Sequence, residues 1–152
     1  MTTRTMAGEI AMNGSGVVQH AFGARTESRK ALWTGRILSG LVVAFMLVDG
    51  GMKVAGAQVV LEGAVALGYP ASTMFGIGAV LLACTLLYAI PRTAVLGVVL
   101  LTGYLGGAIA THVRVGDPML THTLFPIYVA ALAWGALYLR DARVRNFISS
   151  NQ

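Results

Sequence analysis

Charged side chains are scarce in this sequence. Asp, Glu, Lys and Arg make up 11% of the 152 residues, whereas hydrophobic residues make up 56%. A soluble domain usually carries about 25% charged residues, and a soluble fold of this length has no room to hide so much apolar surface. We therefore predict a single domain that uses a lipid bilayer as its solvent.

Cysteine and acidic residues are also few. The single cysteine, Cys84, excludes an internal disulfide framework and a CxxC redox pair, and its apolar surroundings predict a small buried side chain. The net charge of +5 does not indicate nucleic-acid binding, because the basic residues stand at the ends of apolar runs and form no basic stripe. Residues 1–30 lack the apolar core of a signal peptide and are predicted to form a flexible cytoplasmic tail.

Four apolar runs have the length of membrane spans, at about 32–53, 74–90, 93–110 and 124–139. The first run is uncharged between Arg36 and Asp49, which corresponds to roughly 20 Å of helix. Because the hydrocarbon core is about 30 Å thick, we expect Asp49 near the membrane boundary. Residues 91–92, Pro-Arg, separate the second and third runs and predict an antiparallel helical hairpin.

The segment 57–67 is too short to cross a membrane. Its apolar residues Ala57, Leu61 and Val65 recur every four positions, which predicts a short helix lying at the membrane interface. The fold class predicted from these runs is all-α, a four-helix transmembrane bundle with this interfacial helix between the first two spans. We expect residues 1–30 as a tail, 31–146 as the transmembrane domain and 147–152 as a C-terminal tail.

Basic residues predict the orientation. Lys53 and Arg114 fall on one side of the predicted membrane. The opposite side holds a larger set: Arg25, Arg29, Lys30, Arg36, Arg92, Arg140, Arg143 and Arg145. Short cytoplasmic loops carry the excess of Lys and Arg, so both termini are expected in the cytoplasm.

The stretch GYLGGAIATHVRVGDP at 103–118 joins a glycine-rich apolar run to polar residues. We expect the membrane boundary near Thr111, with the polar residues in an outward loop. The glycines form small-xxx-small pairs, such as Gly103 with Gly107, and predict close packing between helices.

A ligand site is predicted where this loop meets the end of the first span. Asp49 and Lys53 are one helical turn apart, and two interpretations stand: an ion pair at the helix end, or charged groups facing a cavity. Tyr104 shares a helix face with Thr111 and needs a partner for its hydroxyl. The predicted ligand-binding residues are Asp49, Lys53, Tyr104, His112, Arg114 and Asp117.

Metal and haem sites are not expected. His112 and His122 are ten residues apart, which matches no compact zinc motif, and axial haem ligation needs a histidine inside the bundle. The sequence also shows no nucleophile with an adjacent base. These observations favour a protein that is not an enzyme on its own.

The chain resembles the DoxX-like family of small four-helix membrane proteins over residues 31–146. The resemblance is carried by DGGMK at 49–53, LGYP at 67–70, YAIPRTAVLG at 88–97, GYLGGAIATHVRVGDP at 103–118 and ALAWGALYLRDARVR at 131–145. It implies a bundle in the bacterial cytoplasmic membrane. The family's namesake belongs to a quinone-linked sulfur-oxidising complex, whereas most members have no assigned activity.

Two functions are therefore expected from the sequence. One is a non-catalytic membrane component. It is either an accessory subunit, in a membrane protein complex or a homo-oligomer, or a binder of a small ligand. The other, by analogy with the family, is a membrane subunit of a quinone-linked oxidoreductase system, with the quinone near Tyr104, His112 and Arg114.

Overall fold

The computed structural model describes residues 3–149, and the side chains of residues 29–145. Every element within this part of the chain is helical, as predicted. In chain order the elements are α1 (Thr3–Val54), α2 (Gln58–Ala66), α3 (Thr73–Ala89), α4 (Ala94–Val115), the π-helical turn η1 (Met119–Thr123), α5 (Phe125–Arg140) and α6 (Ala142–Ser149).

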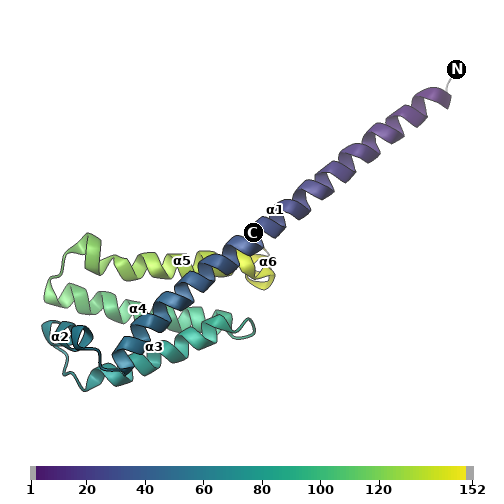
Figure 1. The fold of residues 1–152 in the computed structure, drawn as a ribbon. Helices are drawn as coiled ribbons and strands as arrows, with labels where there is room; N and C mark the ends of the chain where they lie inside the picture. The colour runs from purple at the N-terminus through teal and green to yellow at the C-terminus, as the bar shows by residue number, and fades with distance from the viewer. Residues whose placement is uncertain (1–2, 150–152) are drawn as a thin grey trace.

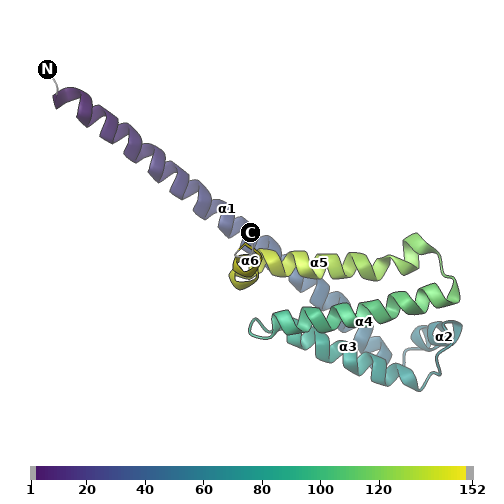
Figure 2. The same ribbon diagram turned by 180° about the vertical axis from the view of Figure 1, so that it is seen from behind.

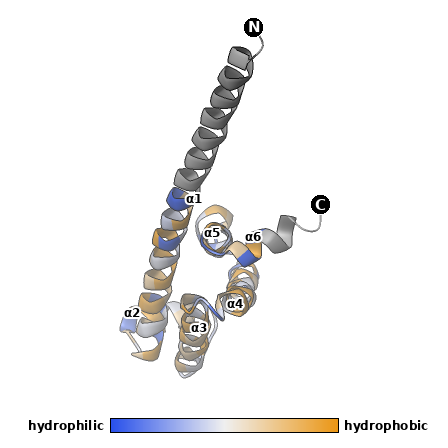
Figure 3. Cartoon of the chain, turned by 90° about the vertical axis from the view of Figure 1, so that its right-hand side faces the viewer, coloured by the Kyte–Doolittle hydropathy of each residue, from blue (hydrophilic) through white to orange (hydrophobic). Residues whose placement is uncertain are grey.

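Helices α1, α3, α4 and α5 pack side by side around a shared core, and α1 crosses the other three diagonally (Figures 1 and 2). The end of the bundle that holds α2 and η1 is called the α2 end, and the end that holds residues 90–93 and α6 is called the hairpin end. Apolar residues predominate around α3 and α4 (Figure 3). The side chains of Ile37, Leu41 and Leu86 are each more than half exposed, which leaves an apolar outer surface.

Among the described residues, three helical stretches are long and apolar enough to cross a membrane: Arg29–Val54, Ala94–Val115 and Met119–Arg140. Helix α3 is equally apolar but shorter, with 17 residues. At 1.5 Å per residue it is about 26 Å long, close to the ~30 Å hydrocarbon core. The chain therefore has three to four helices able to span a membrane.

The predicted hairpin is confirmed, and a glycine determines how tightly it closes. Helix α3 ends at Ala89 and α4 begins at Ala94. A Cβ added at Gly97 would overlap the backbone nitrogen of Tyr88, so the two helices approach more closely than any side chain allows. Gly35 likewise allows a close approach of α1 and α5, because a Cβ added there would lie 2.8 Å from the backbone nitrogen of Arg140.

Tyr88 connects three helices in the core. Its side chain is fully buried, and its hydroxyl lies 2.9 Å from the carbonyl oxygen of Ala133 and 3.1 Å from Ser39 Oγ. Because the phenol has one proton and the carbonyl can only accept, Tyr88 donates to Ala133 and accepts from Ser39. The hydroxyl thus links α3 to both α1 and α5. Cys84 lies in the same core and is 6% exposed, as predicted.

Helix α4 continues past the predicted boundary at Thr111 and ends at Val115. Nothing before Gly116 stops the helix. Gly116 adopts a left-handed φ of 74°, and Pro118 follows it. His112 and Arg114 therefore stand in the last turns of a helix, and the expectation that they lie in a loop is wrong.

The prediction that the α4 glycines pack helices together is also wrong. A Cβ at Gly103, Gly106 or Gly107 would meet no described atom within 4 Å. The spacing of small residues indicates that a close approach is possible, but it does not supply a partner helix. In contrast, Gly78 of α3 does approach α1, because its Cβ would lie 2.9 Å from the carbonyl oxygen of Gly50.

The predicted domain boundaries do not coincide with the ends of elements. Helix α1 runs across residue 30 and α6 runs across residue 147. The outermost residues of both predicted tails, 1–2 and 150–152, lie outside the described residues. The division into two tails and a transmembrane domain stays a prediction, as does the orientation of the termini.

Candidate functional site

A cavity of about 580 Å³ opens at the α2 end, within the ~300–1,000 Å³ range typical of small-molecule sites. Residues of α1, α2, α3, α4 and α5 form its wall, which is mainly apolar. Four of the six predicted site residues line it: Asp49, Lys53, Tyr104 and His112. Arg114 and Asp117 are not part of the wall, but both contact residues at its border.

Asp49 and Lys53 form an ion pair, with 2.5 Å between Lys53 Nζ and Asp49 Oδ1. Their side chains are 35% and 17% exposed, respectively. The two interpretations left open by the sequence are therefore compatible, because the pair stands at the end of α1 and both residues also line the cavity. Lys53 keeps further N–H groups that can donate toward the cavity.

Tyr104 lies on the α4 face of the cavity between Gly103 and Gly107. Among the side chains described for residues 29–145, its hydroxyl contacts no hydrogen-bond partner. The two glycines beside it bring no side chain into the cavity. Part of the open volume thus exists because α4 has no side chain at these two positions.

His112 is the last α4 residue in the cavity wall. Its Nδ1 lies 2.6 Å from the Asp117 carboxylate, so Asp117 fixes the orientation of the ring from outside the cavity. The ring of His122 lies 6.0 Å from that of His112, measured between centroids. Among the described residues, no group of three or more His, Cys, Asp and Glu side chains is arranged to hold a metal ion.

Arg114 points to the residues that follow α2 instead of into the cavity. Its Nη2 donates to the carbonyl oxygen of Leu67 at 2.6 Å, and its guanidinium lies 5.8 Å from the ring centroid of Tyr69. Tyr69 in turn bonds Thr111, with 2.9 Å between the two hydroxyl oxygens. Thr111 also donates to the carbonyl oxygen of Gly107, so Tyr69 must be the donor to Thr111.

These contacts join residues 67–69, which follow α2, to the last two turns of α4. We call the segment 58–69, which consists of α2 and these residues, the strap. The predicted apolar stripe of this segment is not the face that meets the cavity. Val60, Gly63 and Ala64 line the cavity instead, and Val65 remains 65% exposed. The sequence alone did not distinguish the two faces, because Val59 and Val60 make both of them apolar.

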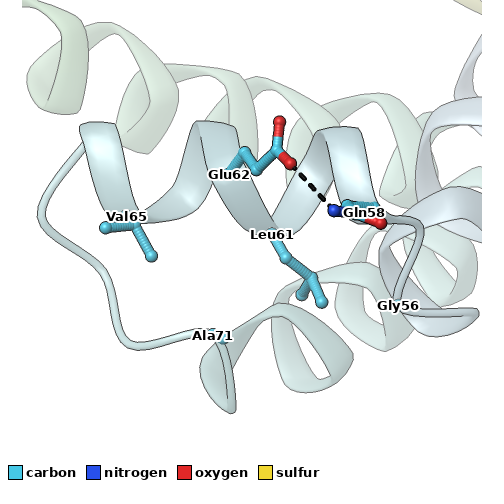
Figure 4. Close-up of a pocket in the computed structure, with 6 residues that line it drawn as sticks. All are labelled: Gly56, Gln58, Leu61, Glu62, Val65 and Ala71. Carbon is cyan, nitrogen blue, oxygen red and sulfur yellow. Dashed lines mark hydrogen bonds between the residues drawn. The ribbon is translucent and has the colours of Figure 1, made fainter.

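A second hollow lies on the outer side of the strap (Figure 4). It is open and shallow, and it is lined by Gly56, Gln58, Leu61, Glu62, Val65 and Ala71. Its polar groups already bond each other, because Gln58 Nε2 donates to Glu62 Oε1 at 3.1 Å. This hollow therefore offers less for ligand recognition than the cavity beneath the strap.

Sequence reasoning missed several residues of the cavity wall. Phe45 of α1 and Phe125 of α5 both line it, and their rings pack edge to face with 5.7 Å between centroids. An aromatic residue in an apolar run carries no signal that separates a cavity wall from a lipid-facing surface. The spacing of Gly103 and Gly107 predicts helix packing, and it does not distinguish a packed helix face from a cavity wall.

Comparison with known proteins agrees with the resemblance seen in the sequence. The model of the DoxX-like family matches residues 37–136, which is about two thirds of the chain. The match includes the C-terminal third of α1, all of α2, α3 and α4, and most of α5. No curated protein and no solved structure matches the chain. Together with the apolar helices, the family match identifies a multi-pass membrane protein. The chain belongs to the DoxX-like family.

Proposed function

We propose that this protein is a four-span component of the bacterial cytoplasmic membrane that binds a small amphipathic ligand and is not an enzyme on its own. The observation that carries the proposal is the cavity at the α2 end. It combines a mainly apolar wall with a few polar groups from separate helices: Asp49 and Lys53 of α1, and Tyr104 and His112 of α4. Ligand sites in proteins have this composition.

The roles of the six site residues divide in two. Asp49, Lys53, Tyr104 and His112 contact the ligand, because they line the cavity. Asp117 and Arg114 act at a distance: the first orients the His112 ring, and the second fastens residue 67 to the end of α4.

A bound ligand can be identified after purification in a mild detergent. We expect the extracted lipid of the wild-type protein to contain a compound enriched over the bulk membrane lipid. Asp49→Asn and Lys53→Met together remove both charges, so they leave no buried charge unpaired, and this double variant should fold but lose the compound. If the double variant retains the compound, or if nothing is enriched in the wild type, ligand binding at this site is wrong.

The orientation proposal places both termini in the cytoplasm, and the arginines at the hairpin end support it. Arg143 bonds the carbonyl oxygen of Pro91, and Arg140 bonds that of Tyr88, so basic side chains gather around one end of the bundle. A reporter that is active only in the periplasm should work when fused after Gly116 and fail at the C-terminus. Activity at the C-terminus would contradict the topology.

The quinone-linked role is the second candidate. The hydroxyl of Tyr104 favours it, because that hydroxyl lines the cavity and bonds none of the side chains described for residues 29–145. A quinone head is uncharged and carries carbonyl oxygens, which accept hydrogen bonds of the kind that Tyr104 and Lys53 can donate. When bound, a quinone would supply the redox chemistry, whereas the protein would bind and orient it. A quinone in the lipid extract supports this role.

An accessory role predicts a partner. Purification at low detergent followed by mass spectrometry should recover a membrane protein complex or a homo-oligomer. Recovery of monomeric protein with its ligand alone would favour the independent ligand binder over the accessory subunit.

A further inference from the structure

We propose that the cavity is loaded from the side, out of the bilayer, between α1 and α5, and that its occupant is a single-chain amphiphile with an uncharged polar head. This inference rests on the proposed function, because it specifies the ligand class and the access route of the same cavity. Three features of the structure support it: the closed aqueous side, the aromatic border of the lipid side and the internal pairing of the charges.

The aqueous side of the cavity is closed by the strap. The residues after α2 are bonded to α4 at two places, through Arg114 to the carbonyl oxygen of Leu67 and through Tyr69 to Thr111. Ala64 of the strap is 3% exposed and packs as part of the cavity wall. Access from water would require these polar contacts to break together.

On the lipid side, no such polar contact joins α1 to α5 among the described side chains. Helices α1 and α5 are closest at the hairpin end, where Gly35 meets Arg140, and they diverge toward the α2 end (Figures 1 and 2). Phe45 and Phe125 stand where the helices diverge. Both side chains line the cavity, and they are 44% and 45% exposed. A single edge-to-face pair, worth about 0.5–1.5 kcal/mol, is the described contact that a ligand must open there.

The α4 wall is shaped for a hydrocarbon chain. Gly103 and Gly107 are one turn apart, and a Cβ at either would project into open space. A flexible chain can lie over these two glycines, with its head near Lys53 and Tyr104. Gly106 stands on the same helix but outside the cavity wall, and it also has open space around it. It therefore provides a matched control.

The head is uncharged because Asp49 and Lys53, the charged side chains of the cavity wall, already pair with each other. Lys53 is paired with Asp49, and His112 contacts Asp117. A charged head would either break a pair or remain without a counter-ion in an apolar site, and both are costly. A hydroxyl or carbonyl head instead accepts from Tyr104 or Lys53 and leaves both pairs intact.

The ligand class is tested by photolabelling in phosphatidylcholine vesicles that contain the full-length protein. Diazirine-bearing analogues of hexadecanol and of palmitate are the two probes, and labelled peptides are mapped by mass spectrometry. We expect the alcohol to label residues 103–112, with roughly tenfold less labelling by the carboxylate. Equal or stronger labelling by the carboxylate would overturn the uncharged head.

Two glycine variants test the position of the chain. Gly107→Leu fills the cavity and should reduce labelling by the alcohol by roughly tenfold or more, since even one methylene group changes binding in an apolar pocket by about that much. Gly106→Leu should leave labelling unchanged. Thermal unfolding shows whether each variant is folded, and Gly103→Leu replaces Gly107→Leu if the latter is not. Equal effects of the cavity and control variants would overturn the position.

The access route is tested by the rate at which labelled hexadecanol leaves the protein for empty vesicles. Phe125→Ala should accelerate the release several-fold. The control is Phe75→Ala, because Phe75 of α3 is also exposed but does not line the cavity, and this variant should leave the rate unchanged. Tyr69→Phe loosens the strap and should leave the rate unchanged. Acceleration by Tyr69→Phe without acceleration by Phe125→Ala would show access from water and overturn the route.

These outcomes separate the inference from the proposed function. If neither probe labels residues 103–112 but the lipid extract contains an enriched compound, the ligand class is wrong and the binding function stands. If the extract also contains nothing enriched, the proposed function itself fails.

Discussion

At the scale of single residues, the glycines of this chain act in two opposite ways. Gly35 and Gly97 let two helices approach until no side chain fits between them. Gly103 and Gly107 face open space and keep a cavity from being filled. The same residue type therefore allows close contacts between helices at some positions and borders an open cavity at others, and the surroundings decide which.

Replacing Gly97 by alanine tests the close approach. The added methyl group would overlap the backbone of Tyr88, which cannot move aside as a flexible side chain can. We expect a loss of at least the ~1–3 kcal/mol typical of overpacking, measured as a lower thermal unfolding temperature in a fixed detergent. Gly106→Ala is the control, and it should stabilise the protein by up to ~1 kcal/mol through helix propensity. Equal unfolding temperatures of the two variants would contradict this interpretation.

At the scale of elements, helix ends decide where the polar groups stand. Gly116 adopts a left-handed conformation and ends α4, so His112 is still part of the helix. Its side chain lines the cavity. At the other end of the bundle, Asp141 ends α5 and precedes α6. The backbone N–H of Arg143 donates to Asp141 Oδ1 at 2.9 Å, which is the contact of a helix N-cap.

The Asp141 cap predicts a pH dependence of α6. Hydrogen bonds from the Arg143 side chain hold the pKa of the Asp141 carboxyl below its ordinary value of 3.8. Because the pKa is lower in the folded state, the stabilisation is fully present above that ordinary value and is lost as the pH falls through the lowered pKa. Amide hydrogen exchange in α6 should accelerate over that acidic range, and Asp141→Ala should accelerate it at neutral pH by removing a cap worth about 1 kcal/mol. Exchange that is unaffected by Asp141→Ala would refute the cap.

At the scale of the whole molecule, one buried hydroxyl determines how three helices meet. Tyr88 of α3 accepts from Ser39 of α1 and donates to the Ala133 carbonyl of α5. Arg140 adds a contact from α5, with its guanidinium 4.7 Å from the Tyr88 ring centroid. These contacts lie toward the hairpin end, so α1 and α5 are held there and remain free to diverge toward the cavity.

A double-mutant cycle of Ser39→Ala and Tyr88→Phe tests this connection. Tyr88→Phe leaves the Ser39 hydroxyl and the Ala133 carbonyl without their buried partner. We expect it to cost about 1 kcal/mol, because hydrogen bonds between membrane helices average roughly 0.6 kcal/mol and reach about 1.7. The double variant should cost less than the sum of the single variants. Additive costs in thermal unfolding would show that the two hydroxyls do not interact.

Much of the helical order was predictable from residue type. Apolar runs bounded by charges predicted the ends of α3 and α5 to within about a residue, and Pro91 predicted the hairpin. Asp49, Lys53, Tyr104 and His112 line one cavity, and the charged residues were expected near each other because charge in an apolar run is costly and gathers at a boundary. Their role as a ligand site stays a prediction. The direction of Arg114 was not predictable, because its long side chain can reach α2 as easily as the cavity.

The sequence by itself determined that the chain is helical, that its helices are apolar enough for a membrane and that it resembles the DoxX-like family. Composition and local spacing decide these properties, and neither depends on which helices touch. Only the tertiary structure decided that the α4 glycines border a cavity, that Phe45 meets Phe125 and that the strap is bonded to the end of α4. Those features depend on how α1 crosses the bundle, and contacts between residues far apart in the chain set that crossing.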